Sequence, residues 1–262
     1  MTAAISKLNN IKLRDQAYAY ICNQFAEGKL HVGSQLSIGT LAKEMGISRT
    51  PVSEALLRMQ LENKVEQVPR GGTIVRKPSA REIAELYQLR ELVEGHAAAH
   101  AAQTFTPEDF ALLDTILDQI KNVCIAMRNA NQTELDAEEI RKYLAADLAF
   151  HAAILRGTDN RWMRKAIEDA QAFLLICCSR RHEKHTLKTM IDIYRWHGRI
   201  RNAIKRQDPN AARDLMQKHI RISCEGAVKF LAEHEEDSDK LEYDFTSLMP
   251  QGFDALGKNQ KP

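Results

Sequence analysis

The sequence predicts a mainly α-helical protein with two parts, a small N-terminal unit that ends in a β-hairpin and a larger all-helical antiparallel bundle. Three observations support this prediction. Apolar residues recur at helical spacing along most of the 262 residues. Glycine and proline interrupt this pattern often in the first third of the chain and less often afterwards. Charge is also unevenly divided, because residues 1–77 hold 11 basic and 6 acidic residues, whereas the remainder has a net charge of −3.

The N-terminal unit is expected to contain three helices followed by the hairpin. The first helix ends at Gly28, and its apolar positions are Leu13, Ala17, Ile21 and Phe25. After a loop, KLHVGSQLS, a short helix, IGTLAKEM, stops at Gly46, a residue suited to a left-handed turn. Ser48 is expected to cap the third helix, RTPVSEALLRMQLE, in which Pro51 occupies the first turn, where its missing N–H costs little. Two β-like stretches follow, VEQV and TIVR, and the glycines of the connecting PRGG permit a tight turn.

From residue 79 onward the periodicity is helical throughout. Ser79 and Glu82 form a capping-box sequence before the first long apolar run. Two further helix starts are marked by a capping residue followed by proline, at Thr106-Pro107 and at Asp208-Pro209. We expect helices over roughly residues 79–103, 107–130, 133–157, 160–182, 186–206 and 209–233.

The composition excludes several classes of protein. No run approaches the ~18 apolar residues that a membrane-spanning helix needs, and the N-terminus lacks the apolar core of a signal peptide. The cysteines number five and form no CxxC pair, which does not fit a secreted disulfide framework. We therefore expect a cytoplasmic protein without a membrane partner.

Three helices and a hairpin in this order predict a winged helix-turn-helix in the basic unit, with double-stranded DNA as its partner. The second helix of the helix-turn-helix would present its N-terminal residues to the major groove, namely Ser48, Arg49, Thr50 and Ser53. An arginine there can make two hydrogen bonds to guanine, and the hydroxyls can bind phosphate. Arg70 and Gly71 at the hairpin tip would meet a groove wall. The alternative is that these helices form an ordinary helical hairpin within a bundle.

The stretch DLAFH places Asp147 and His151 four residues apart inside an apolar helical run, and thus on one face of the helix. On its own, this pair is more typical of a solvated helix edge than of a binding site. Two later histidines, His197 and His219, lie in the middle of predicted helices with apolar neighbours. A metal site in a helical bundle takes donors from several helices, so the four residues are candidate ligands. His96 and His100 are a second i,i+4 pair, without a third donor that the sequence places near them.

Both parts of the sequence resemble a known protein family. LAKEMGISRTPVSEAL followed by VPRGGTIV resembles the N-terminal domain of the GntR family of bacterial transcription regulators, and the helical remainder resembles the FCD class of effector domain found in FadR-type members. The resemblance covers about residues 11–232. It implies that DNA is contacted by Ser48, Arg49, Thr50, Arg70 and Gly71. The chain departs from the family at Ser53, where arginine is frequent, and this implies a weaker contact there or a different operator sequence.

The order Asp-x3-His, a histidine 46 residues later and another 22 residues after that resembles the ligand pattern of the metal-binding FCD subgroup. It implies that a divalent metal is held by Asp147, His151, His197 and His219. This donor set suits zinc first, and also nickel, iron or manganese. Arg90 would lie in the effector pocket and clamp a carboxylate; the alternative is a surface pair with Glu91 or Glu94.

We therefore expect a winged helix-turn-helix DNA-binding domain over residues 1–77, a helical effector-binding and dimerisation domain over 78–233, and a tail over 234–262. The leading interpretation is a homodimeric transcription regulator, a repressor, that responds to a small organic acid bound beside the metal. The alternative is a regulator that senses the metal itself. A metalloenzyme would need a general base beside the metal, and no second carboxylate is placed like one; the intact ligand pattern also argues against an acyl-CoA binder.

Overall fold

The computed structural model describes the whole chain except residues 1, 27–28, 70, 132–136, 179–185 and 234–262. The chain divides into two compact units between Pro78 and Ser79, and each unit is described by itself. The expected C-terminal tail lies outside the described residues. The mainly helical fold class is confirmed, with a small sheet confined to the first unit.

The first unit contains three helices and a three-stranded antiparallel sheet of order β1-β3-β2. Its elements are α1 (Thr2–Ala26), β1 (Gln35–Leu36), α2 (Ile38–Met45), α3 (Arg49–Leu61), β2 (Val65–Val68) and β3 (Gly72–Val75). The expected hairpin is present as β2 and β3, which pair from Val65 with Val75 to Val68 with Gly72. The strand β1 was not expected, because two residues carry no periodicity; it exists through its pairing with β3.

Local signals explain most of the helix ends in this unit. Gly46 adopts a left-handed φ of 65° and ends α2, as predicted. Ser48 occupies the N-cap position of α3 with extended backbone, but its side chain makes no capping hydrogen bond. The expected cap is therefore wrong in its chemistry, although it is right in its position. Helix α1 packs on α3, and the core between them is fully buried at Ala17, Ile21, Val52, Ala55 and Met59.

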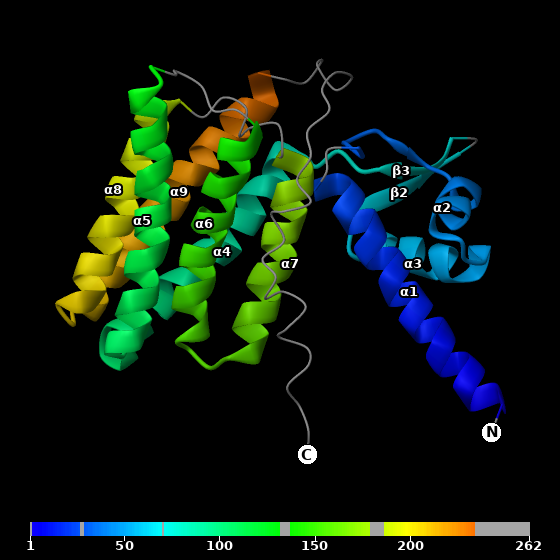
Figure 1. The fold of residues 1–262 in the computed structure, drawn as a ribbon, viewed down its shortest axis with the longest axis horizontal. Coiled ribbons are helices and arrows are strands. Elements are labelled where there is room, and N and C mark those ends of the chain that lie inside the picture. Colours follow the sequence, from blue (N-terminus) through cyan, green and yellow to red (C-terminus); the bar gives the residue numbers. More distant parts are fainter. Residues whose placement is uncertain (1, 27–28, 70, 132–136, 179–185, 234–262) are drawn as a thin grey trace. The chain divides into compact units, whose positions relative to one another are not determined.

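The second unit is a bundle of helices that lie side by side in Figure 1. They are α4 (Ala80–Thr104), α5 (Pro107–Asn129), α6 (Ala137–Arg156), α7 (Arg161–Cys178), α8 (Leu187–Lys205) and α9 (Pro209–Glu233). The Ser79–Glu82 capping box is confirmed at α4, and Thr106 with Asp109 forms a second one at α5. Asp208 accepts a hydrogen bond from the backbone N–H of Ala211 at 2.9 Å, which starts α9 as expected.

Packing within the bundle brings α4 against α9 and places α5 in contact with both α6 and α8. Gly95 allows the first of these contacts, because a Cβ there would lie 2.7 Å from the Cγ of Gln217 on α9. The largest fully buried side chains of the bundle include Ile83, Leu113, Ile120, Tyr143, Phe150, Ile154 and Met190. Within the described part of the chain, no helix is both long and apolar enough to cross a membrane.

Candidate DNA-reading surface and metal centre

The N-terminal turn of α3 presents a polar surface to solvent. Its exposed side chains are Ser48, Arg49, Thr50 and Ser53, whereas Pro51 and Val52 between them are buried in the core of the unit. The guanidinium of Arg49 lies beside Gly39 of α2, where a Cβ would be in ordinary van der Waals contact at 3.7 Å from Nη2. Because Ser48 does not cap the helix, the first amide groups of α3 stay free of that side chain. Helix N-termini with accessible amides attract anionic groups such as phosphate.

The turn between β2 and β3 is the wing of this unit, and it is tied down on two sides. The N–H of Gly71 donates to the carbonyl of Val68 at 3.0 Å, and Gly72 takes a left-handed φ of 75°. The side chain of Gln35 reaches across from β1 and donates from Nε2 to the carbonyl of Gly71 at 2.6 Å. Sequence reasoning missed Gln35 because β1 has no periodicity. Arg70, the predicted cation of the wing, lies outside the described residues.

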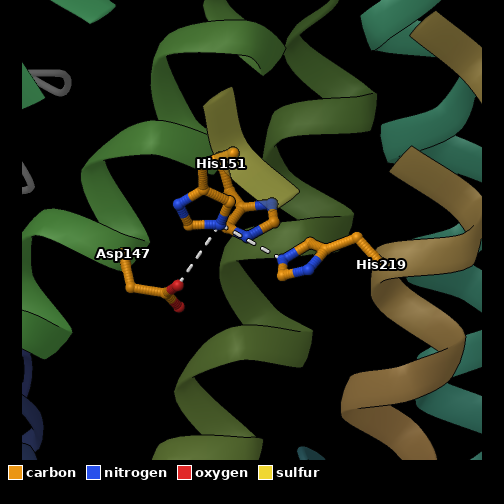
Figure 2. Close-up of side chains that lie close together, drawn as sticks. Asp147, His151 and His219 are labelled. Atoms are coloured by element: carbon orange, nitrogen blue, oxygen red, sulfur yellow. Dashed lines mark hydrogen bonds and ion pairs between the residues drawn. The ribbon is translucent and has the colours of Figure 1, made fainter. Parts of the chain in front are cut away.

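In the second unit, the four candidate ligands converge in the interior of the bundle. Helix α6 supplies Asp147 and His151, α8 supplies His197, and α9 supplies His219. One donor atom from each lies within 4.8 Å of every other. The Nε2 atoms of His197 and His219 are 3.2 Å apart, and Oδ1 of Asp147 is 3.5 Å from Nε2 of His197. Figure 2 shows the labelled side chains of Asp147, His151 and His219 pointing toward one another.

These separations fit a metal ion. A tetrahedral zinc ion with nitrogen bonds of 2.0–2.1 Å keeps its ligands about 3.3–3.4 Å apart, and the observed 3.2 Å between the two imidazole nitrogens is close to that value. The three histidines are 2%, 0% and 3% exposed, whereas Asp147 is half-buried. Burial, together with the neighbouring His219 and His151, lowers the pKa of His197 well below its ordinary value. His197 is therefore neutral near pH 7, the state in which imidazole binds metals.

The ring of His197 is held by stacking. Phe150, which is fully buried, lies parallel to it with ring centroids 4.0 Å apart and an interplanar angle of 11°. Nδ1 of His197 is buried and has no hydrogen-bond partner among the described residues. Phe150 was not among the predicted site residues, although its place directly before His151 in DLAFH marked it as a neighbour of the centre.

A buried carboxylate from a fourth helix faces His151. Glu94 on α4 is 1% exposed, and its Oε2 lies 2.5 Å from Nδ1 of His151. Neither atom meets the geometric criteria of a hydrogen bond with any described residue. The two atoms are nevertheless in close contact as an ion pair. Oε1 of Glu94 accepts a hydrogen bond from Nε of Arg90 at 2.7 Å. Burial would raise the pKa of Glu94, but Arg90 and His151 outweigh burial and lower that pKa to about 2.

The sequence left two interpretations of Arg90 open, a role in the effector pocket and an ion pair with Glu91 or Glu94 on the surface. Arg90 pairs with Glu94, as one reading had it, but the pair is buried in the bundle and not on the surface. Burial disfavours the charge, yet Glu94 raises the pKa of Arg90 above its ordinary value, so the guanidinium stays charged. A role in binding an effector carboxylate stays a prediction.

The second histidine pair, His96 and His100, is not part of the centre. His96 is exposed, and the nearby contact of His100 is with the hydroxyl of Thr104 at 3.2 Å from Nδ1. Within the described residues, the cluster of Asp147, His151, His197 and His219 is the group with metal-binding geometry.

Comparison with protein families decides the identity of both units. Residues 13–75 match the family described as "Bacterial regulatory proteins, gntR family", and residues 85–222 match the FCD domain. The chain belongs to the GntR family of regulators and carries an FCD domain. The gntR match lies within the first unit and the FCD match lies within the second.

Relatives of this GntR-family regulator agree with the assignment. It is 30% identical over 137 residues to an uncharacterised HTH-type transcriptional regulator of Mycobacterium tuberculosis, a match that covers 52% of this chain and about half, 53%, of that relative. It is 22% identical over 220 residues to the probable D-xylose utilization operon transcriptional repressor of Paenarthrobacter nicotinovorans, covering 84% and 91% of the two chains. The solved structure of Escherichia coli McbR/YncC shares the fold, with a TM-score of 0.67, 21% identity, and coverage of 86% of this chain and 99% of that one.

Proposed function

We propose that this regulator is a repressor whose operator binding is controlled by a small carboxylate-containing metabolite, bound beside a divalent metal in the helical unit. The observation that supports the metal is the convergence of Asp147, His151, His197 and His219 from three helices, with donor atoms within 4.8 Å of one another. Three nearly buried imidazoles close together are costly without a ligand, because buried polar groups need partners.

The donor set defines the chemistry of the metal. Three imidazoles and one carboxylate suit zinc, and they also suit nickel, iron or manganese. A metal that prefers six ligands would keep two positions for a bidentate organic acid. Arg90, buried on α4 and charged, is the cation that we assign to the effector side of the site. A carboxylate effector is the ligand class that matches both groups.

The DNA-binding unit supports a sequence-specific contact. We assign base reading to Arg49, which is exposed at the start of α3, and phosphate binding to Ser48 and Thr50. Ser53, Arg70 and Gly71 complete the predicted contacts. A homodimer in the cytoplasm would place two such units on half-sites ~34 Å apart, so small movements of the helical units would misalign them. The repressor role is supported by the similarity to the probable D-xylose utilization operon repressor of Paenarthrobacter nicotinovorans.

A second candidate function is metal sensing, in which the metal is itself the signal. The candidate ligands come from three helices, α6, α8 and α9. Metal binding alone would therefore link these helices, and this favours a metal-sensing role. The two functions differ in one measurement. A metal sensor changes its operator affinity with zinc alone, whereas the proposed repressor needs zinc and an organic acid together.

The test compares full-length protein with the variants His151→Ala and His219→Ala. Elemental analysis is expected to give about one metal per chain for the wild type and much less for both variants. His96→Ala, which removes an exposed histidine of α4, is the matched control and should keep its metal. Operator binding is measured on duplexes that the wild type selects from a random library. Full metal content in both ligand variants would contradict the proposal.

A further inference from the structure

We propose that Glu94 and Arg90 are positioning residues of the metal centre: Glu94 holds His151 by its Nδ1 so that Nε2 faces the metal, and Arg90 holds Glu94. The inference rests on the proposed metal site and deepens it. It adds α4 to the centre, because the four candidate ligands come from α6, α8 and α9 alone.

Glu94 is buried between two polar partners. Its carboxylate is 1% exposed and is bracketed by two groups, with Oε2 at 2.5 Å from Nδ1 of His151 and Oε1 at 2.7 Å from Nε of Arg90. His151 is itself 2% exposed. A carboxylate in such surroundings is retained only where charged or polar partners compensate its burial. The two contacts provide that compensation and fix the carboxylate in one orientation.

The two ring nitrogens of His151 would have different roles in a metal site. A neutral imidazole carries one N–H and one lone pair, and an ionised carboxylate can only accept hydrogen bonds. A histidine that binds a metal through the lone pair of Nε2 carries its proton on Nδ1, and Nδ1 is the nitrogen of His151 that faces Glu94. A ligating histidine whose other nitrogen is held by a carboxylate is fixed in tautomer and orientation, and it is a more basic ligand.

His151 and His197 are held in the bundle by different contacts. His197 is oriented by stacking on Phe150, and its Nδ1 has no hydrogen-bond partner among the described residues. His151 meets Phe150 only edge to face, at 5.7 Å between centroids and 89° between planes. His151 also lies parallel to His219, with ring centroids 5.3 Å apart and an interplanar angle of 11°, a wider separation than the 4.0 Å between His197 and Phe150. The contact with Glu94 at 2.5 Å is therefore the closer restraint on the ring of His151.

Arg90 would have a role in metal binding as well as in effector binding. If Arg90 served only to clamp an effector, its removal would leave metal binding unchanged in the absence of effector. If Arg90 holds Glu94, its removal leaves a buried carboxylate without its cation and weakens metal binding even when no organic acid is present. These two roles give different results in one titration.

The experiment measures zinc affinity of the full chain by competition with a chromophoric chelator, without any organic acid. Glu94→Gln is expected to weaken zinc binding by about 10–100-fold, the usual effect of losing such a partner. Glu91→Gln is the matched control, because Glu91 lies one turn earlier on α4 and pairs with Arg221 at 2.6 Å on the surface. It should bind zinc like the wild type. Arg90→Ala should weaken binding in the same direction as Glu94→Gln.

Two further measurements separate positioning from folding. The double variant Arg90→Met, Glu94→Gln removes both buried charges together, so it leaves no unpaired ion; it should fold and still bind zinc weakly. Cobalt(II) in place of zinc should give visible absorption bands that differ between Glu94→Gln and the wild type but not between Glu91→Gln and the wild type.

The outcomes separate this inference from the proposed function. Wild-type zinc affinity and an unchanged cobalt spectrum in Glu94→Gln and in the double variant, together with loss of zinc in His151→Ala, would overturn the positioning role and leave the metal centre intact. Unchanged zinc affinity in His151→Ala as well would overturn both. Weakened zinc binding in Glu94→Gln with an unchanged control supports the inference.

Discussion

Replacing His197 by leucine is expected to lower the stability of the helical unit when metal is bound, and to leave it unchanged or slightly higher without metal. The side chain is fully buried, its Nδ1 has no hydrogen-bond partner among the described residues, and its pKa is lowered by burial and by its two histidine neighbours. Without metal, these features are destabilising. Leucine has a similar volume and no polar atom, so it removes the unpaired group without opening a large cavity.

The magnitude follows from two opposing contributions. An unsatisfied buried polar group costs about 1–3 kcal/mol. Imperfect packing of leucine against Phe150, where the imidazole now stacks, costs up to about 1.5 kcal/mol. The metal-free variant should therefore lie between about 0.5 kcal/mol below and about 3 kcal/mol above the wild type, with about 1 kcal/mol above it near the middle of this range. With zinc at a hundredfold excess over its dissociation constant, the wild type gains about 2.7 kcal/mol that the variant lacks.

The assay is thermal unfolding of both proteins by calorimetry, once with a chelator and once with excess zinc. One kcal/mol corresponds to about 2–4 °C for a domain of this size. The variant should unfold at the same temperature as the wild type or slightly above it in chelator, and several degrees below it in zinc. A variant that is less stable by the same amount in both conditions would show that His197 only fills space in the core, and the reasoning would fail.

Three further predictions concern protonation, DNA reading and assembly. In chelator, the wild type should lose stability as the pH falls below about 6.5, because the unfolded chain then takes up a proton that buried His197, with its lowered pKa, does not bind. The variant His197→Leu should lose less stability over the same pH range. Identical pH profiles of the two proteins, measured by chemical denaturation, would contradict this prediction. Arg49→Ala should weaken binding to the selected operator by roughly 1–3 kcal/mol and binding to random duplex only slightly, as measured by fluorescence anisotropy; an equal loss on both would make Arg49 a phosphate contact. A fragment that starts at Ser79 should sediment as a dimer, and a monomer would place the dimer contacts in the first 78 residues.

The sequence alone determined the helices, most of their ends and the candidate ligands. Apolar residues repeat with the period of the helix, and caps such as Ser79 and Thr106 act on amides three residues away, so both signals are local. The spacing of Asp147 and His151 is local in the same sense, because residues four apart share a helix face in any fold. For these features, neighbours in the sequence are also neighbours in space.

Only the tertiary structure decided which polar residues are buried and what they face. Glu94 looked like a surface partner of Arg90, yet it is enclosed in the bundle and contacts His151, which is distant in sequence. The two-residue strand β1 exists only through pairing with β3, and Gln35 reaches the wing for that reason. Such contacts depend on how separate elements pack and not on the period of any one of them. The 3.2 Å between the imidazoles of His197 and His219 is therefore a property of the packed bundle, whereas their presence on two helices is a property of the sequence.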